Sequence, residues 1–220
     1  MRNKIKLIRT YFPAVKNFLA GKREIAGFSM VELTAAMAIT LIILAVAVMT
    51  FSGALKTRER ENSRVDALTS AQAAINIMTR EIANSGYGIT TNGISVNDST
   101  AQRLHLRANV SNNDYTTDDA GEDITFFFDN ASQSVLRYDA NTGVTSGVIN
   151  RVSQVEFGYF DYTSSTTNTI PNSVPTANTG RVRITLWVIL ADIQGQPTNQ
   201  RVQFTSDVTL RNSPYMLSQY

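Results

Sequence analysis

The sequence predicts an α+β fold in which a long N-terminal α-helix, with a transmembrane half and an amphipathic half, packs on an antiparallel β-sheet. An uncharged stretch covers residues 33–55 and continues into a segment whose apolar residues recur every three or four positions. The rest of the chain, residues 86–220, repeatedly alternates apolar and polar side chains between polar turns. Such alternation is typical of antiparallel strands with one buried and one wet face.

The first element is a basic leader, residues 1–27. It holds seven of the 20 Lys and Arg residues against one acid, Glu24. An excess of basic residues beside a membrane span stays on the cytoplasmic side, so the larger part of the chain is expected to be exported. A secretory signal peptide would have small residues after its apolar core, whereas Gly27 lies before it. Cleavage at Gly27 would leave the helix attached to the exported domain.

The second element, residues 28–55, is the membrane span. Its uncharged stretch has 23 residues, and at about 1.5 Å per residue this crosses a hydrocarbon layer of about 30 Å. Glu32 stands at the head of the stretch. A carboxylate near hydrocarbon is unfavourable unless a cation meets it, so Glu32 requires a partner. The alternative is an interfacial residue that the helix macrodipole stabilises.

These residues resemble the type IV prepilin family: Lys22-Arg23, Gly27, Phe28, Glu32 and then the apolar run. The resemblance implies that a prepilin peptidase cuts between Gly27 and Phe28 and methylates the amine of Phe28. It also implies that Glu32 meets the terminal amine of a neighbouring subunit. Two departures from common pilins are the long leader and an apolar helix without proline, which leaves Gly53 as its expected soft point.

The implied partners are the prepilin peptidase, other minor and major pilins, and an inner-membrane pilus assembly platform. The implied location is the inner membrane, crossed once with the N-terminus in the cytoplasm and the C-terminal domain in the periplasm. The protein would then enter a pilus or a pseudopilus. Removal of a leader with a net charge of +6 from a precursor of +2 leaves the mature chain near −4, so we expect no nucleic-acid partner.

The third element, residues 56–85, is the amphipathic half of the helix and ends at Asn84-Ser85-Gly86. Its expected buried face, covered by the sheet of the same chain, is Val65, Leu68, Ala71, Ile75, Met78 and Ile82. Expected strands follow at residues 104–108, 124–128, 135–138, 152–162, 181–190 and 202–210, with a turn at Gly195-Gln196-Pro197. We expect them to form one antiparallel sheet. Their order is similar to PilW-type minor pilins and to the J-type minor pseudopilin of type II secretion.

Catalytic and metal-binding patterns are weak, and we expect neither an enzyme nor a cofactor. The single histidine, His105, lies between Arg103 and Arg107 and is expected to face solvent. A cluster of carboxylates could offer oxygen ligands to calcium or form a solvated loop: Asp114, Asp118, Asp119, Glu122 and Asp123. The polar segment 163–180 is expected to be a contact surface or a flexible insertion. The chain has no cysteine, so its exported domain must rely on its core.

Three functions remain open from the sequence. The first is a minor type IV pilin that initiates or builds a pilus. The second is a minor pseudopilin of a type II secretion system. The third is a membrane-anchored adhesin or binding module.

Overall fold

The computed structural model describes residues 27–112, 114–163, 166–167, 170–192 and 197–218. Residues 1–26 of the leader and the turn residues Gly195 and Gln196 lie outside these ranges. The chain forms two compact units whose boundary in the sequence falls between Gly53 and Ala54. The expected α+β class is confirmed, since a long N-terminal helix is followed by antiparallel strands.

Helix α1, Met30–Asn84, contains both the uncharged stretch and the amphipathic segment. In the first unit, the described side chains up to Gly53 are all exposed. In the second unit, one stripe of α1 is buried: Ala67, Ala71, Ala74, Ile75, Met78, Ile82 and Ala83. Of the face that helix periodicity predicted to be buried, the residues from Ala71 onwards are indeed covered.

The predicted burial of Val65 and Leu68 is wrong. Their side chains are 56% and 52% exposed, whereas Ala67 is buried. Successive helix residues are about 100° apart, which turns Leu68 away from the face that Ala67 presents to the strands. Small alanines occupy the covered face at this end of the stripe, so a search for large apolar residues selects the wrong positions.

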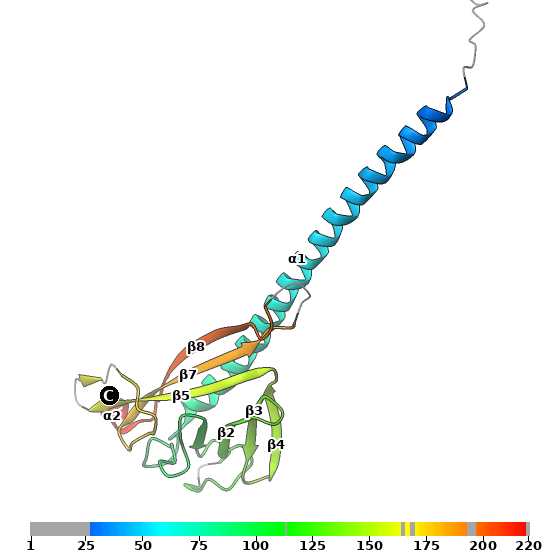
Figure 1. The fold of residues 1–220 in the computed structure, drawn as a ribbon. Coiled ribbons are helices and arrows are strands. Elements are labelled where there is room, and N and C mark those ends of the chain that lie inside the picture. Colours follow the sequence, from blue (N-terminus) through cyan, green and yellow to red (C-terminus); the bar gives the residue numbers. More distant parts are fainter. Residues whose placement is uncertain (1–26, 113, 164–165, 168–169, 193–196, 219–220) are drawn as a thin grey trace, which may run out of the picture. The chain divides into compact units, whose positions relative to one another are not determined.

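The strands form two antiparallel sheets where one was expected. The first has the order β1-β2-β3-β4 and consists of Arg103–Arg107, Asp123–Asp129, Ser134–Asp139 and Val144–Ile149. The second has the order β6-β5-β7-β8 and consists of Thr166–Thr167, Val152–Thr163, Thr179–Ile189 and Arg201–Thr209. Figure 1 shows β5, β7 and β8 side by side and β2, β3 and β4 as another group. A short helix α2, Pro214–Leu217, follows.

The break between the sheets lies at the turn after β4. Arg151 has a φ of 58°, in the left-handed region, and the next residue, Val152, pairs with Val188 of β7 instead of continuing beside β4. The carbonyl of Arg151 accepts a hydrogen bond of 2.7 Å from the N–H of Ile189. This local reversal transfers the chain from one sheet to the next.

A single apolar core joins the buried stripe of α1 to the inner faces of both sheets. Large fully buried members come from β1, β2, β5 and β7: Leu104, Phe126, Phe157, Tyr159, Ile184 and Leu186. Tyr159 directs its hydroxyl to the carbonyl of Thr100 at 2.8 Å, which satisfies the one polar atom of this ring. The second unit thus has the core that a chain without disulfides needs.

The connection from α1 to β1 includes a close crossing of two backbones. Gly93 has a φ of +78°, and a Cβ added there would lie 2.1 Å from the nitrogen of Gly86 and 2.4 Å from the carbonyl oxygen of Arg107. Two hydrogen bonds hold the crossing: Arg107 N–H to the Gly93 oxygen at 2.7 Å, and Gly86 N–H to the Arg107 oxygen at 3.0 Å. Glycine at position 93 is required by both space and conformation.

The described part of segment 163–180 is bonded to its surroundings. Asn172 and Tyr159 exchange two backbone hydrogen bonds of 2.7 and 3.0 Å. Asp161 accepts hydrogen bonds from the hydroxyls of Thr176 and Thr179 at 2.8 and 3.0 Å. Among the described residues 170–180, Asn172 therefore forms an isolated bridge with β5, and Thr176 and Thr179 are bonded to Asp161 of the same strand.

Candidate functional site

The start of α1 is the first candidate site because it contains the three residues that the prepilin resemblance singles out. Gly27, Phe28 and Ser29 are not helical, and α1 begins at Met30. Ser29 N–H donates to Oε2 of Glu32 at 2.9 Å, and Glu32 N–H donates to Oγ of Ser29 at 3.2 Å. This reciprocal pair is a capping box, which satisfies two backbone donors at a helix N-terminus.

The capping box defines where the helix begins and how Glu32 is held. Replacement of an N-cap serine typically costs about 1 kcal/mol of helix stability, and a carboxylate in the first turn adds a favourable interaction with the helix dipole. Within the described residues only Oε2 of Glu32 has a hydrogen-bond partner, so Oε1 is available to another group. The Ser-x-x-Glu pattern signals this capping box in the sequence, whereas the charge argument above pairs Glu32 with a cation or with the helix macrodipole and does not include Ser29.

The helix beyond Glu32 suits a hydrocarbon environment. It is the one helix among the described residues that is long and apolar enough to cross a membrane. Its threonines bond within the helix: the hydroxyl of Thr40 donates to the carbonyl of Ala36 at 2.7 Å, and that of Thr50 to the carbonyl of Val46 at 3.0 Å. Hydroxyl groups satisfied in this way carry little penalty in lipid.

His105 is the second candidate, and its predicted exposure to solvent is wrong. It is 8% exposed. Its Nε2 lies 2.6 Å from Oδ1 of Asp123, and its Nδ1 lies 3.2 Å from Oδ2 of Asp98. Arg107 donates to the other oxygen of Asp123 at 2.9 Å. Hydrogen bonds from Ser95 and then from His105 lower the pKa of Asp98 below its usual value.

The physical reason for the burial is the pairing of His105 with carboxylates that the strand pattern does not reveal. Asp98 comes from the segment before β1 and Asp123 from the start of β2. Both ring nitrogens are engaged, so the imidazole has no free nitrogen to activate a nucleophile. The arrangement ties the segment before β1 to the first sheet.

The acidic cluster around residues 114–123 is spread over several different environments. Glu122 is buried, and its Oε1 accepts hydrogen bonds of 2.8 Å from the N–H groups of Val110 and Ser111. Asp114 accepts from Thr116, while Asp119 accepts from Asn112 at 2.5 Å. Burial, and then the nearby charge of Glu122, raise the pKa of Asp119.

The positions of these carboxylates do not favour the calcium alternative. Among the described residues, which omit residue 113 of this loop, no three His, Asp or Glu side chains converge closely enough to hold a metal ion. Asp123 already bonds to His105 and Arg107. Glu122 accepts hydrogen bonds from backbone N–H groups of the loop. Glu122 is a structural element of the loop that the sequence pattern did not distinguish from its exposed neighbours.

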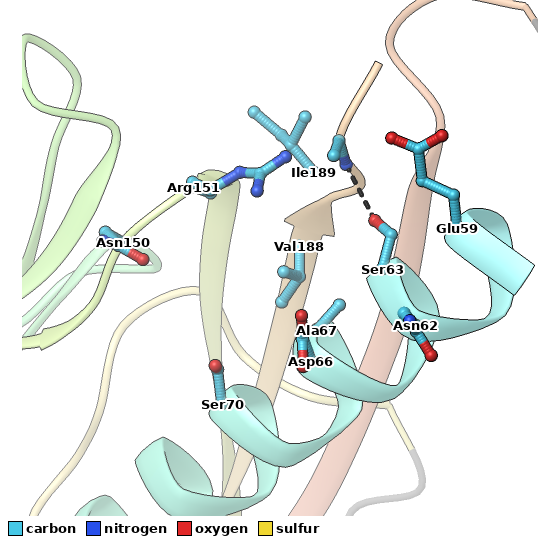
Figure 2. A pocket seen from close by; sticks show the side chains of 11 residues that line it. Glu59, Asn62, Ser63, Asp66, Ala67, Ser70, Asn150, Arg151, Val188 and Ile189 are labelled. Atoms are coloured by element: carbon cyan, nitrogen blue, oxygen red, sulfur yellow. Dashed lines mark hydrogen bonds between the residues drawn. The ribbon is translucent and has the colours of Figure 1, made fainter. Parts of the chain in front are cut away.

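A cleft of about 330 Å³ lies between α1 and the ends of β4 and β7 (Figure 2). Glu59 and Ser63 lie on α1, and Arg151 lies on the turn across from them. The hydroxyl oxygen of Ser63 accepts a hydrogen bond of 3.1 Å from the N–H of Ala191. The walls contain no histidine to act as a base, and Ser63 already serves to hold the end of β7 against the helix.

The geometry is compatible with a pilin-like architecture, namely a long N-terminal helix with an apolar first part and a second part packed on antiparallel strands. Comparison with protein-family models, with curated protein sequences and with solved structures finds no match to this chain.

Proposed function

We propose that the chain is a minor type IV pilin, a structural subunit without enzymatic activity that takes part in initiating or building a pilus. The observation that carries this proposal is the position of the capping box. Ser29 and Glu32 start the helix directly after the Gly27–Phe28 peptide bond, so that bond lies in a non-helical segment. Peptidases act on extended segments, and a peptide bond within the helix would first have to unwind.

The apolar helix supports a membrane location for the processed subunit, which would stay in the inner membrane until it is assembled. Cleavage after Gly27 would make Phe28 the terminal residue and leave the hydrogen bond from Ser29 N–H to Glu32 intact. The second carboxylate oxygen then faces the amine of another subunit. Opposite charges attract strongly in a low-dielectric surrounding, and their pairing would set the stagger between neighbouring helices.

The second unit supports the structural role. It buries the amphipathic part of α1 under its own strands, so the unit is a self-contained body attached to a membrane helix. A subunit of a filament needs a stable body and an assembly helix, and both are present.

The proposal is tested by expressing the full chain together with a prepilin peptidase and measuring the mature N-terminus by mass spectrometry. We expect N-methylated Phe28 as the first residue. Gly27→Val should leave the precursor uncut, whereas the control Gly53→Val, made in open space within the helix, should be cut normally. A mature chain that begins at any other residue would refute the prepilin assignment. Co-purification with sheared pili, and not with secretion components, then separates a pilin from a pseudopilin.

A further inference from the structure

We infer that the outer face of the second sheet carries a binding site for a neutral sugar ring, with Trp187 as its stacking surface. A hollow of about 230 Å³ opens on this face, and residues of β5, β7 and β8 line it together with Pro171. The inference does not depend on the proposed function, because every residue of the hollow belongs to the second unit.

Strand pairing places Trp187 on the face of the sheet that is turned away from the core. Trp187 pairs with Gln154 of β5 and with Gln203 of β8. Its neighbour Leu186 is fully buried, so the alternation along β7 directs Trp187 to the opposite face. The next rung on this face consists of three residues with polar ends: Glu156, Thr185 and Thr205. The only tryptophan of the chain is partly exposed there and is not part of the core cluster.

Pro171, in the segment between β6 and β7, provides a wall at the other end of the hollow. A Cβ added to Gly158 would lie 2.8 Å from the Cβ of Pro171, so the proline ring rests on the bare backbone of β5. Two backbone hydrogen bonds between Asn172 and Tyr159, of 2.7 and 3.0 Å, hold this segment in place. The rungs of Trp187 and Gly158 are four residues apart along β5, or about 13 Å. A flat ring therefore has room between the indole and the proline.

The charges around the hollow favour a neutral ligand. Arg183, on the wall, donates two hydrogen bonds of 2.7 and 2.9 Å to the two carboxylate oxygens of Asp207, so its charge is balanced. Glu156 is exposed, and within the part of the chain that the structure describes its carboxylate has no ion pair or hydrogen bond. An anionic ligand would meet the like charge of Glu156. A hydroxyl group, by contrast, can donate to this carboxylate without bringing a charge.

One aromatic ring among several unused donors and acceptors matches the two-sided chemistry of a sugar. A pyranose ring with equatorial hydroxyls has faces made of C–H groups, which pack on an indole, and an edge of hydroxyls that need hydrogen-bond partners. Glu156, Gln203 and Thr205 offer a carboxylate, an amide and a hydroxyl beside Trp187. The volume is below the about 300–1,000 Å³ of pockets for drug-sized ligands, so the hollow suits a single ring.

The same residues are less suited to a cation. Cations bound by π-systems lie over the faces of aromatic rings, often within a cage of several rings. Trp187 is the one aromatic residue that lines the hollow, and the guanidinium of Arg183 would lie beside the bound cation. A neutral ring uses the hydroxyl and amide groups of the hollow, whereas a compact cation leaves them without partners.

The test is saturation-transfer NMR on the full chain, purified in a detergent whose headgroup is not a sugar. The probes are methyl β-glucopyranoside and methyl β-N-acetylglucosaminide, whose ring substituents are all equatorial, and the control is sorbitol, an open-chain polyol without a ring face. We expect transfer to the ring C–H protons of at least one sugar and none to sorbitol. No transfer to either sugar, or equal transfer to sorbitol, would overturn the inference.

Two variants locate the binding. Trp187→Ala should abolish the transfer, with folding checked by circular dichroism. Glu156→Gln/Gln203→Ala changes two exposed side chains, keeps Trp187 as a fluorescent reporter of the titration, and should weaken binding at least about tenfold. Sugar binding that survives in this folded double variant at full strength would overturn the site.

The matched control, Glu61→Gln/Gln72→Ala, makes the same chemical changes at two exposed positions of α1 that do not line the hollow. It should bind the sugar as wild type does, and an equal loss in the control would reduce the effect to net charge and overturn the site. A further arm titrates tetramethylammonium. Its binding in the absence of any sugar binding would assign the hollow to a cation and refute the sugar assignment.

Discussion

Replacement of Ile75 by alanine is the perturbation that best tests how α1 packs in the second unit. Ile75 is 7% exposed and belongs to the core shared by the helix and both sheets. Isoleucine-to-alanine changes in a core cost about 2–5 kcal/mol, because apolar transfer energy is lost and a cavity remains. For a domain of this size, about 3 kcal/mol corresponds to a decrease of about 6–12 °C in Tm. The matched control is Leu68→Ala, since Leu68 is 52% exposed. Its expected cost is below about 1 kcal/mol.

The assay is thermal and urea unfolding of the full chain, followed by the fluorescence of Trp187, which is the only tryptophan. Trp187 lies in β7 and reports on the second unit. Because the sequence periodicity predicted both residues to be buried, equal and large losses for Ile75→Ala and Leu68→Ala would refute the packing described here. Equal and negligible losses would mean that the helix stripe is not part of the core of this unit.

Three further predictions follow from the same contacts. Glu32→Ala should be processed normally but should fail to co-purify with other pilins, with Glu32→Gln failing to a similar degree if charge is required; normal incorporation of both would exclude charge pairing. Gly93→Ala should severely reduce soluble protein and Tm. The control Gly143→Ala, at a similar φ of +69° but with no atom within 4 Å of the added Cβ, should cost about 1 kcal/mol of stability. Equal losses would show that backbone conformation, and not the space around the Cβ, determines the cost. Hydrogen bonding by Arg183 lowers the pKa of Asp207, so this pair stabilises the fold above the ordinary value of 3.8 and the contribution is lost as pH falls through the lower folded value. Asp207→Asn should therefore make Tm depend less on pH on the acid side. An unchanged dependence would mean that the Arg183–Asp207 pair does not contribute to acid destabilisation.

Much of the fold could be predicted because the relevant signals are local. The uncharged stretch and the apolar spacing after it predicted one long helix, and α1 is observed at Met30–Asn84. The alternating segments predicted β1, β2, β3, β5, β7 and β8. Strand β4, Val144–Ile149, was missed because most of its side chains are exposed and small, and its place at the edge of the first sheet requires little apolar surface.

The errors share a different cause. Val65 and Leu68 have suitable spacing and hydrophobicity, yet the strands cover the alanine face beside them. His105 lies between two arginines in sequence, yet Asp98 and Asp123 surround its ring in space. In each case the deciding partners lie outside the local pattern to which the residue belongs.

The sequence by itself determined where the helix can enter a membrane, where it can begin and which segments can be strands. These properties depend on consecutive residues: the charge-free run of residues 33–55, the Ser29–Glu32 pair and the period-two patterns. Only the tertiary structure decided which face of α1 is covered, that the strands divide into two sheets at Arg151, that His105 is buried, and that Trp187 joins Glu156 and Gln203. The physical reason is that burial and charge are set by neighbours in space, and strand pairing brings together residues whose separation along the chain leaves no trace in a local pattern.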